Sequence, residues 1–251
     1  MKTFKISAVF SLLALFSLMF TSCSKEEFGP TNKMANRTLD VRAQDCNEFN
    51  HVGAYHNEGL AFLLSNEEFL ANPSVGADEK AAYLKSQLEV FLGSIEVNGE
   101  GYSDGSIDWD PAFEADYADY DAVLDQNRSL SSEEKHVLSS FYGSILASDL
   151  SNGRGLDRFV SSTQDLECSI AGNRFENQEA VFSSIAIGKF SADYWVNGSY
   201  GGNGTESVNW RDVALADALG ALHGMAAGPW GSLGFAILGS ALSYAHQEGY
   251  I

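Results

Sequence analysis

The sequence has 251 residues, a length that fits one large domain or two small ones. Its 15 lysines and arginines stand against 34 aspartates and glutamates, so the formal net charge is −19. This balance argues against a nucleic-acid partner, because phosphates require a basic surface. Hydrophobic residues make up 45% of the chain, enough to bury a core, and this excludes wholesale disorder.

The first 22 residues have the pattern of a signal peptide. Lys2 and Lys5 give a basic start, and the stretch 6–20 is apolar and uncharged. Phe20-Thr21-Ser22-Cys23 follows, with small residues directly before a cysteine. This segment resembles the lipobox of bacterial lipoproteins, and the resemblance implies that Cys23 is acylated and becomes the mature N-terminus. The alternative is an ordinary cleaved signal followed by an unrelated cysteine.

The residues after Cys23 indicate where the chain is exported. Lys25, Glu26 and Glu27 resemble the signal that sends Bacteroidetes lipoproteins to the cell surface, and a solvated charged tether is the alternative. We therefore predict a signal peptide at 1–22 and a lipidated cysteine with a flexible tether at 23–44. The expected location is the outer membrane. Its lipid bilayer would hold the acyl chains of Cys23, which contribute about 0.8 kcal/mol per buried methylene.

A helical domain is predicted over residues 45–208. Its first motif is Gly53-x-x-His56-Asn57-x-x-Leu60, in which Val52, His56 and Leu60 share one helical face. On that face the His56 imidazole has either a structural role in the core or the role of a general base or ligand in a hydrolase. The motif, the export signal and the glycine-rich C-terminal segment together resemble a family of uncharacterised Bacteroidetes surface lipoproteins. This resemblance implies a lineage and no activity.

Helical spacing of apolar residues continues through the middle of the chain. It is found at 84–95, 137–146, 159–170 and 181–195, and Ser131 and Glu134 form a capping box before the second of these. The sequence therefore predicts a mainly α fold, a helical bundle with a C-terminal glycine-rich helical hairpin. An acidic connection at 98–128 contains interleaved aromatic residues that would pin it to the bundle. Its carboxylates form either a solvated face or a cation site, and we predict no specific metal ligand.

Two cysteines remain after Cys23. Cys46 and Cys168 form either one disulfide, as an oxidising compartment would allow, or two buried reduced thiols. Their spacing does not decide between these alternatives. The sequence contains no Cys-x-x-Cys pair and no zinc-type spacing.

The segment 209–251 has an unusual composition. A helix is predicted from Trp210 to Gly228, with Asn209 as its N-cap and Pro229 as its end. Gly220, Gly224 and Gly228 recur every fourth residue as a glycine zipper, which indicates close contact with another helix. The segment either packs as a hairpin within the bundle or contacts a membrane or a second copy, as in the glycine-zipper membrane domains and two-peptide bacteriocins that it resembles.

The sequence contains none of the common catalytic or phosphate-binding motifs. Accordingly, we predict no catalytic residue and no cofactor. The leading hypothesis is a lipid-anchored outer-membrane protein with a non-enzymatic binding or envelope role. One alternative is a membrane-active or self-associating protein that acts through 209–251, and a second is a hydrolase that uses His56.

Overall fold

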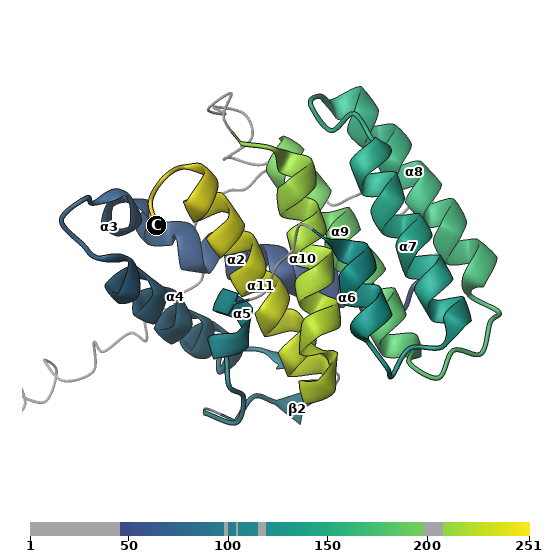
Figure 1. The fold of residues 1–251 in the computed structure, drawn as a ribbon, viewed down its shortest axis with the longest axis horizontal. Helices are drawn as coiled ribbons and strands as arrows, with labels where there is room; N and C mark the ends of the chain where they lie inside the picture. Colours follow the sequence, from purple (N-terminus) through teal and green to yellow (C-terminus); the bar gives the residue numbers. More distant parts are fainter. Residues whose placement is uncertain (1–45, 98–99, 104, 115–118, 198–207) are drawn as a thin grey trace, which may run out of the picture. The chain divides into compact units, whose positions relative to one another are not determined.

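The computed structural model describes residues 46–97, 100–103, 105–114, 119–197 and 208–251, which belong to one compact unit, Thr38–Ile251. Its longer helices are α2 (Asn50–Leu63), α4 (Ala77–Leu92), α7 (Ser132–Ala147), α8 (Gly153–Ile170), α9 (Gln178–Asn197), α10 (Trp210–Gly224) and α11 (Gly228–Gln247). Shorter elements are α3 (Glu67–Ala71), α5 (Asp110–Glu114), α6 (Tyr120–Gln126) and the paired strands β1 (Glu96–Val97) and β2 (Glu100–Gly101). The prediction of a mainly α-helical bundle is confirmed (Figure 1).

Side-chain caps begin several helices where the sequence indicates them. At the start of α7, Ser131 accepts a hydrogen bond from the Glu134 backbone, and the Glu134 carboxylate accepts one from the Ser131 backbone at 2.7 Å. This is the predicted capping box, in which two free amide groups are satisfied at once. Asn209 caps α10 by accepting from the Arg211 backbone, also as predicted.

The C-terminal hairpin lies at the centre of the bundle. Residues 230–241 of α11 are buried around the whole circumference of the helix, and so are residues 213–222 of α10. Helices α2, α4 and α5 pack against α11, while α7 and α9 pack against α10. In Figure 1 the hairpin therefore stands between α3 and α4 on one side and α7 and α8 on the other. The segments on either side of residue 208 contribute to the same core.

The turn of the hairpin differs from the predicted helix end. Helix α10 stops at Gly224, and a 3-10 turn over Met225–Ala227 leads directly into α11. Gly228 has φ +73°, a conformation that glycine adopts without strain, and Pro229 occupies the first turn of α11. Pro229 therefore starts the second helix, and the predicted continuous helix from Trp210 to Gly228 is wrong.

A large buried aromatic side chain helps to hold the acidic connection against α11. Trp109 is fully buried, and its ring lies against Gly234 of α11 and 5.7 Å from the Phe235 ring. The interleaved aromatic residues predicted this kind of attachment. Because Gly234 has no side chain, the indole can lie directly on the helix backbone.

Candidate functional site

The motif around His56 docks α2 onto the helices behind it. At Gly53, an added Cβ would lie 2.9 Å from the Ala186 carbonyl oxygen, so the absence of a side chain lets α2 and α9 approach closely. Asn57 Nδ2 donates to the Phe190 carbonyl at 2.9 Å, again joining α2 to α9. Leu60 is fully buried in the core. Each residue of the motif thus has a packing contact.

His56 itself lies against a buried carboxylate on α10. Its Nε2 is 3.4 Å from Asp217 Oδ2, and both side chains are fully buried. Its Nδ1 is 3.1 Å from Asn57 Oδ1. The sequence placed His56 on an inward face without a visible partner, and the structure supplies that partner from α10.

Two serine hydroxyls also form hydrogen bonds with Asp217. The hydroxyl of Ser191 on α9 donates to Asp217 Oδ2, and so does that of Ser240 on α11, at 2.9 Å. Trp195 Nε1 donates in turn to Ser240 Oγ at 3.3 Å. The network therefore connects α2, α9, α10 and α11 at one point of the core.

Burial dominates the acid–base properties of this network. Loss of water lowers the pKa of His56 to about 4, although hydrogen bonds with Asn57 and the Ala236 backbone act in the opposite direction. Burial likewise raises the pKa of Asp217 well above its usual value, against the effect of the serine hydroxyls. Both pKa shifts have the same cause: burial disfavours the charged imidazolium and the charged carboxylate when either stands alone in the core.

The geometry does not resemble a nucleophilic active site. In a hydrolytic triad the serine hydroxyl contacts the imidazole, whereas Ser191 and Ser240 both contact the carboxylate. His56, Ser191 and Asp217 are all completely buried. A substrate would have to open the core to reach them.

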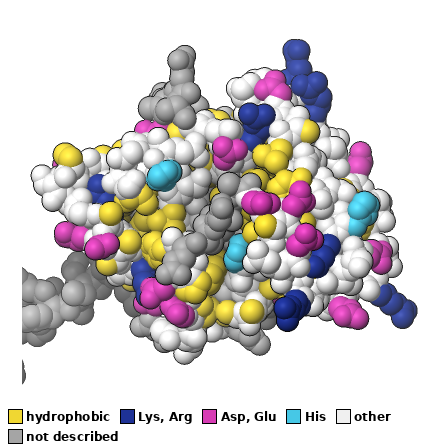
Figure 2. Space-filling view, in the orientation of Figure 1, with side chains coloured by type: hydrophobic (Ala, Val, Ile, Leu, Met, Phe, Trp, Pro, Cys, Tyr) yellow, Lys and Arg dark blue, Asp and Glu magenta, His cyan; other side chains and the backbone are white. Residues whose placement is uncertain are grey.

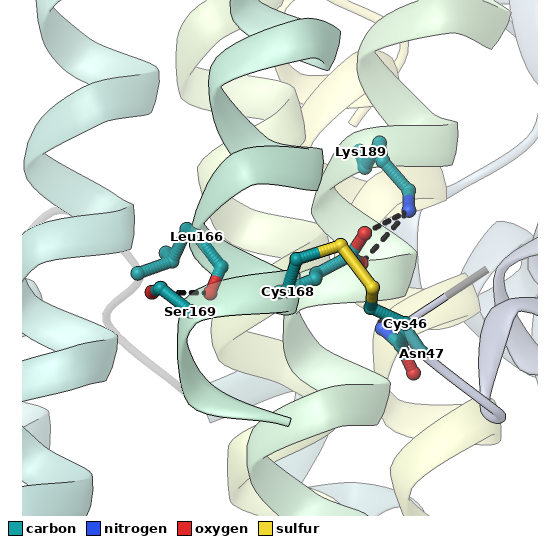
Figure 3. Close-up of a disulfide and its surroundings, with 7 residues drawn as sticks. Cys46, Asn47, Leu166, Cys168, Ser169 and Lys189 are labelled. Atoms are coloured by element: carbon teal, nitrogen blue, oxygen red, sulfur yellow. Dashed lines mark hydrogen bonds and ion pairs between the residues drawn. A yellow bond between two sulfur atoms is a disulfide. The ribbon is translucent and has the colours of Figure 1, made fainter. Parts of the chain in front are cut away.

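A second buried polar cluster surrounds the disulfide between Cys46 and Cys168. The two sulfur atoms are bonded, so of the two alternatives left open by the sequence the structure has the disulfide (Figure 3). The residues next to the cysteines are also paired, because Asn47 Nδ2 donates to Glu167 Oε1 at 2.7 Å. Lys189 Nζ donates to both Glu167 oxygens, at 2.8 and 2.6 Å. The disulfide and the Asn47 hydrogen bond thus fasten the start of the domain to α8, and a buried ion pair joins α8 to α9.

Two of the three predicted zipper glycines lie at the contact between α10 and α11. An added Cβ at Gly220 would be 2.6 Å from the Phe235 carbonyl oxygen, and one at Gly224 would be 2.7 Å from the Ser232 nitrogen. Gly228 does not belong to this contact, because nothing lies within 4 Å of its Cβ position. Its role is the turn described above, and the prediction that it contacts a helix is wrong.

The remaining predicted positions carry no site in the described part of the chain. Cys23, Lys25, Glu26 and Glu27 lie outside the described residues. No group of three or more potential metal ligands occurs among the residues that are described. In the acidic connection, Asp110 binds Lys85 at 2.9 Å in an exposed ion pair. A shallow surface hollow of about 320 Å³ is lined by residues 147–151 and 208–211.

The sequence did not identify Asp217, Lys189 and Glu167 as members of buried polar pairs. The sequence does mark two of these residues as unusual: Asp217 and Lys189 are charged residues within apolar helical stretches. Charged residues in such positions are rarely fully buried unless they are paired. No protein-family model, curated protein or solved structure matches the chain.

Proposed function

We propose that the chain is a lipid-anchored protein of the bacterial outer membrane whose helical domain has a non-enzymatic binding or envelope role. The segment Phe20-Thr21-Ser22-Cys23, with its lipobox pattern, carries this proposal. The Cys46–Cys168 disulfide supports it, because disulfides persist in exported proteins and are rare in the cytosol.

The surroundings of His56 support a role without catalysis. The imidazole and its carboxylate partner are sealed in the core, and the serine hydroxyls bind the carboxylate. These contacts explain the motif structurally, because they hold α2 against the α10–α11 hairpin. A hydrolase that uses His56 would need a nucleophile and an opening that the described residues do not provide.

A binding role would use the outer surface of the bundle. The face in Figure 2 carries charged side chains scattered among uncharged ones, with hydrophobic side chains exposed between them. Among the described residues, the large hydrophobic side chains that are exposed are Phe62, Val90 and Leu146.

A membrane-active or self-associating role for 209–251 is the second candidate. One observation favours it, because residues 210–247 are long and apolar enough to cross a membrane by length and composition. Against it, 67% of the most apolar window of that stretch is buried inside the bundle. Membrane entry would therefore require the hairpin to leave the core around which the domain folds.

Acylation is tested by metabolic labelling with an alkyne fatty acid in a bacterial host that processes lipoproteins. The native chain should become labelled, and Cys23→Ser should lose the label. A Cys46→Ser/Cys168→Ser double variant is the matched control, because it removes the other two cysteines and should keep the label. Label on Cys23→Ser, or none on the native chain, would contradict the proposal.

Surface export is tested separately by protease treatment of intact cells. Replacing Lys25, Glu26 and Glu27 with alanine should keep the label but protect the chain from external protease. Lys33→Ala also removes one positive charge from the tether and should leave the chain accessible. If the triple variant is digested as fast as the native chain, these residues are only a charged tether.

A further inference from the structure

The hydrogen bonds around His56 show which atom is the donor in the contact between His56 Nδ1 and Asn57 Oδ1. Asn57 Nδ2 donates to the Phe190 carbonyl, so the amide oxygen of Asn57 is the atom that faces His56 Nδ1. An amide oxygen only accepts, and Nδ1 is therefore the protonated nitrogen. In the neutral ring this leaves a lone pair on Nε2, the nitrogen that lies 3.4 Å from Asp217 Oδ2.

The contact between Nε2 and Oδ2 then requires a proton. Without one, an imidazole lone pair would face a buried carboxylate at 3.4 Å. With two protons, an imidazolium would be buried beside a neutral carboxyl group and would have no counter-charge. One proton, on either Nε2 or the carboxyl group, gives a pair without net charge.

Among the described side chains that face this pair, no other charged group takes the place of the proton. From α9, Ser191 faces Asp217, while Lys189 lies two residues earlier, about 200° around the helix, and binds Glu167 on α8. From α11, Ser240 and the Ala236 backbone face the pair, and neither is ionisable. Trp195 contributes an indole N–H that donates to Ser240.

We propose that His56 and Asp217 hold one shared proton in the folded chain, and that this proton makes the junction between α2 and the C-terminal hairpin sensitive to pH. The unfavourable effect of burial on either isolated charge agrees with this arrangement. Burial lowers the pKa of His56 to about 4 and raises the pKa of the Asp217 carboxyl group, and both directions favour a folded pair that holds one proton over a wide range of pH.

The sign of the pH dependence follows from the unfolded chain, where the two groups titrate near 6.5 and 3.8. Between these values both the folded and the unfolded chain hold one proton, so this pair adds no pH dependence. Above pH 6.5 the unfolded chain releases its proton while the folded chain keeps it. Folding then takes up a proton, and the unfolding equilibrium constant should rise about tenfold per pH unit.

Urea unfolding between pH 5 and pH 9, followed by circular dichroism, tests this profile. The experiment uses the chain from Ser24 onward, which retains the compact unit Thr38–Ile251. Relative to the native chain, Asp217→Asn should abolish the added loss of stability above pH 6.5, because it has no carboxyl proton to retain. For His56→Gln, the free energy of unfolding should have no pH-independent range and should fall with rising pH from near pH 4. Ser240→Ala removes one hydrogen bond without changing the proton count, so its curve should be displaced but keep the native shape.

Parallel curves for the native chain and Asp217→Asn between pH 7 and pH 9 would overturn the proposal. A second measurement needs no variant and covers the case in which a substitution prevents folding. In NMR spectra of the native chain, the chemical shifts of the His56 ring should not change with pH between pH 5 and pH 8. Titration of His56 near pH 6.5 would show that the pair does not share a proton.

Discussion

Replacing Gly220 with alanine should destabilise the fold, although alanine is the better helix former. The new Cβ would lie 2.6 Å from the Phe235 carbonyl oxygen and 2.8 Å from Ala236 Cα, both backbone atoms of α11. Ordinary contact begins at 3.4 Å, so α10 and α11 would have to separate by about 0.8 Å. Rotation of a side chain cannot relieve this clash, because the atoms belong to the helix backbone.

The size of the effect is the balance of two contributions. Overpacking of a tight core costs about 1–3 kcal/mol, and this contact lies at the upper end because the hairpin forms the centre of the domain. The higher helix propensity of alanine offsets about 1 kcal/mol of this cost. We expect a net loss of about 2 kcal/mol in the free energy of unfolding, equivalent to roughly 4–8 °C in Tm for a chain of this size.

Gly143→Ala is the matched control for the same chemical change. Gly143 lies inside α7, and its Cβ position is 3.9 Å from the Tyr120 hydroxyl, an ordinary contact. This variant should gain about 0.5–1 kcal/mol from helix propensity alone. Urea unfolding of both variants with the disulfide intact compares them directly. If Gly220→Ala is stabilised as much as Gly143→Ala, the close packing of α10 on α11 is refuted.

Two further predictions concern the cluster around the disulfide. Lys189→Met leaves the buried Glu167 carboxylate without its counter-charge and should cost about 3–5 kcal/mol of unfolding free energy. The double variant Lys189→Met/Glu167→Gln should recover a large part of this loss, and equal urea midpoints for the two variants would contradict a buried ion pair. Reduction of the disulfide, which joins residues 122 positions apart, should cost about 4–5 kcal/mol. A drop in Tm with dithiothreitol checks this, and Cys46→Ser/Cys168→Ser should not respond to the reductant; an unchanged Tm in the native chain would contradict the bond.

Local signals in the sequence account for much of the fold. The Ser131–Glu134 box and the Asn209 cap depend on residues at most three apart, so their geometry follows from the helix itself. The composition of 209–251 predicted a glycine-rich helical hairpin, but a helix that is apolar all round is buried either in a core or in a membrane, so the sequence left its surroundings open. The turn was not predictable, since both a helix end and a helix start are compatible with Gly228-Pro229, and the φ of Gly228 decided between them.

The buried polar contacts could not be predicted in the same way. Asp217 meets His56 only because α10 crosses α2 deep in the core, and that crossing depends on the whole bundle. Lys189 and Glu167 lie on different helices and likewise meet only through packing. An isolated charge in an apolar helix indicates that a buried partner exists, but the sequence does not identify it.

The central claim is that Cys23 attaches the chain to the membrane and that 209–251 does not. Liposome flotation of the lipid-free chain from Ser24 onward tests it most directly, with the acylated chain as the positive control. We predict that the acylated chain floats and that the lipid-free chain stays in solution as a folded monomer. Flotation of the lipid-free chain would contradict the claim and would show that the α10–α11 hairpin leaves the core to enter the bilayer.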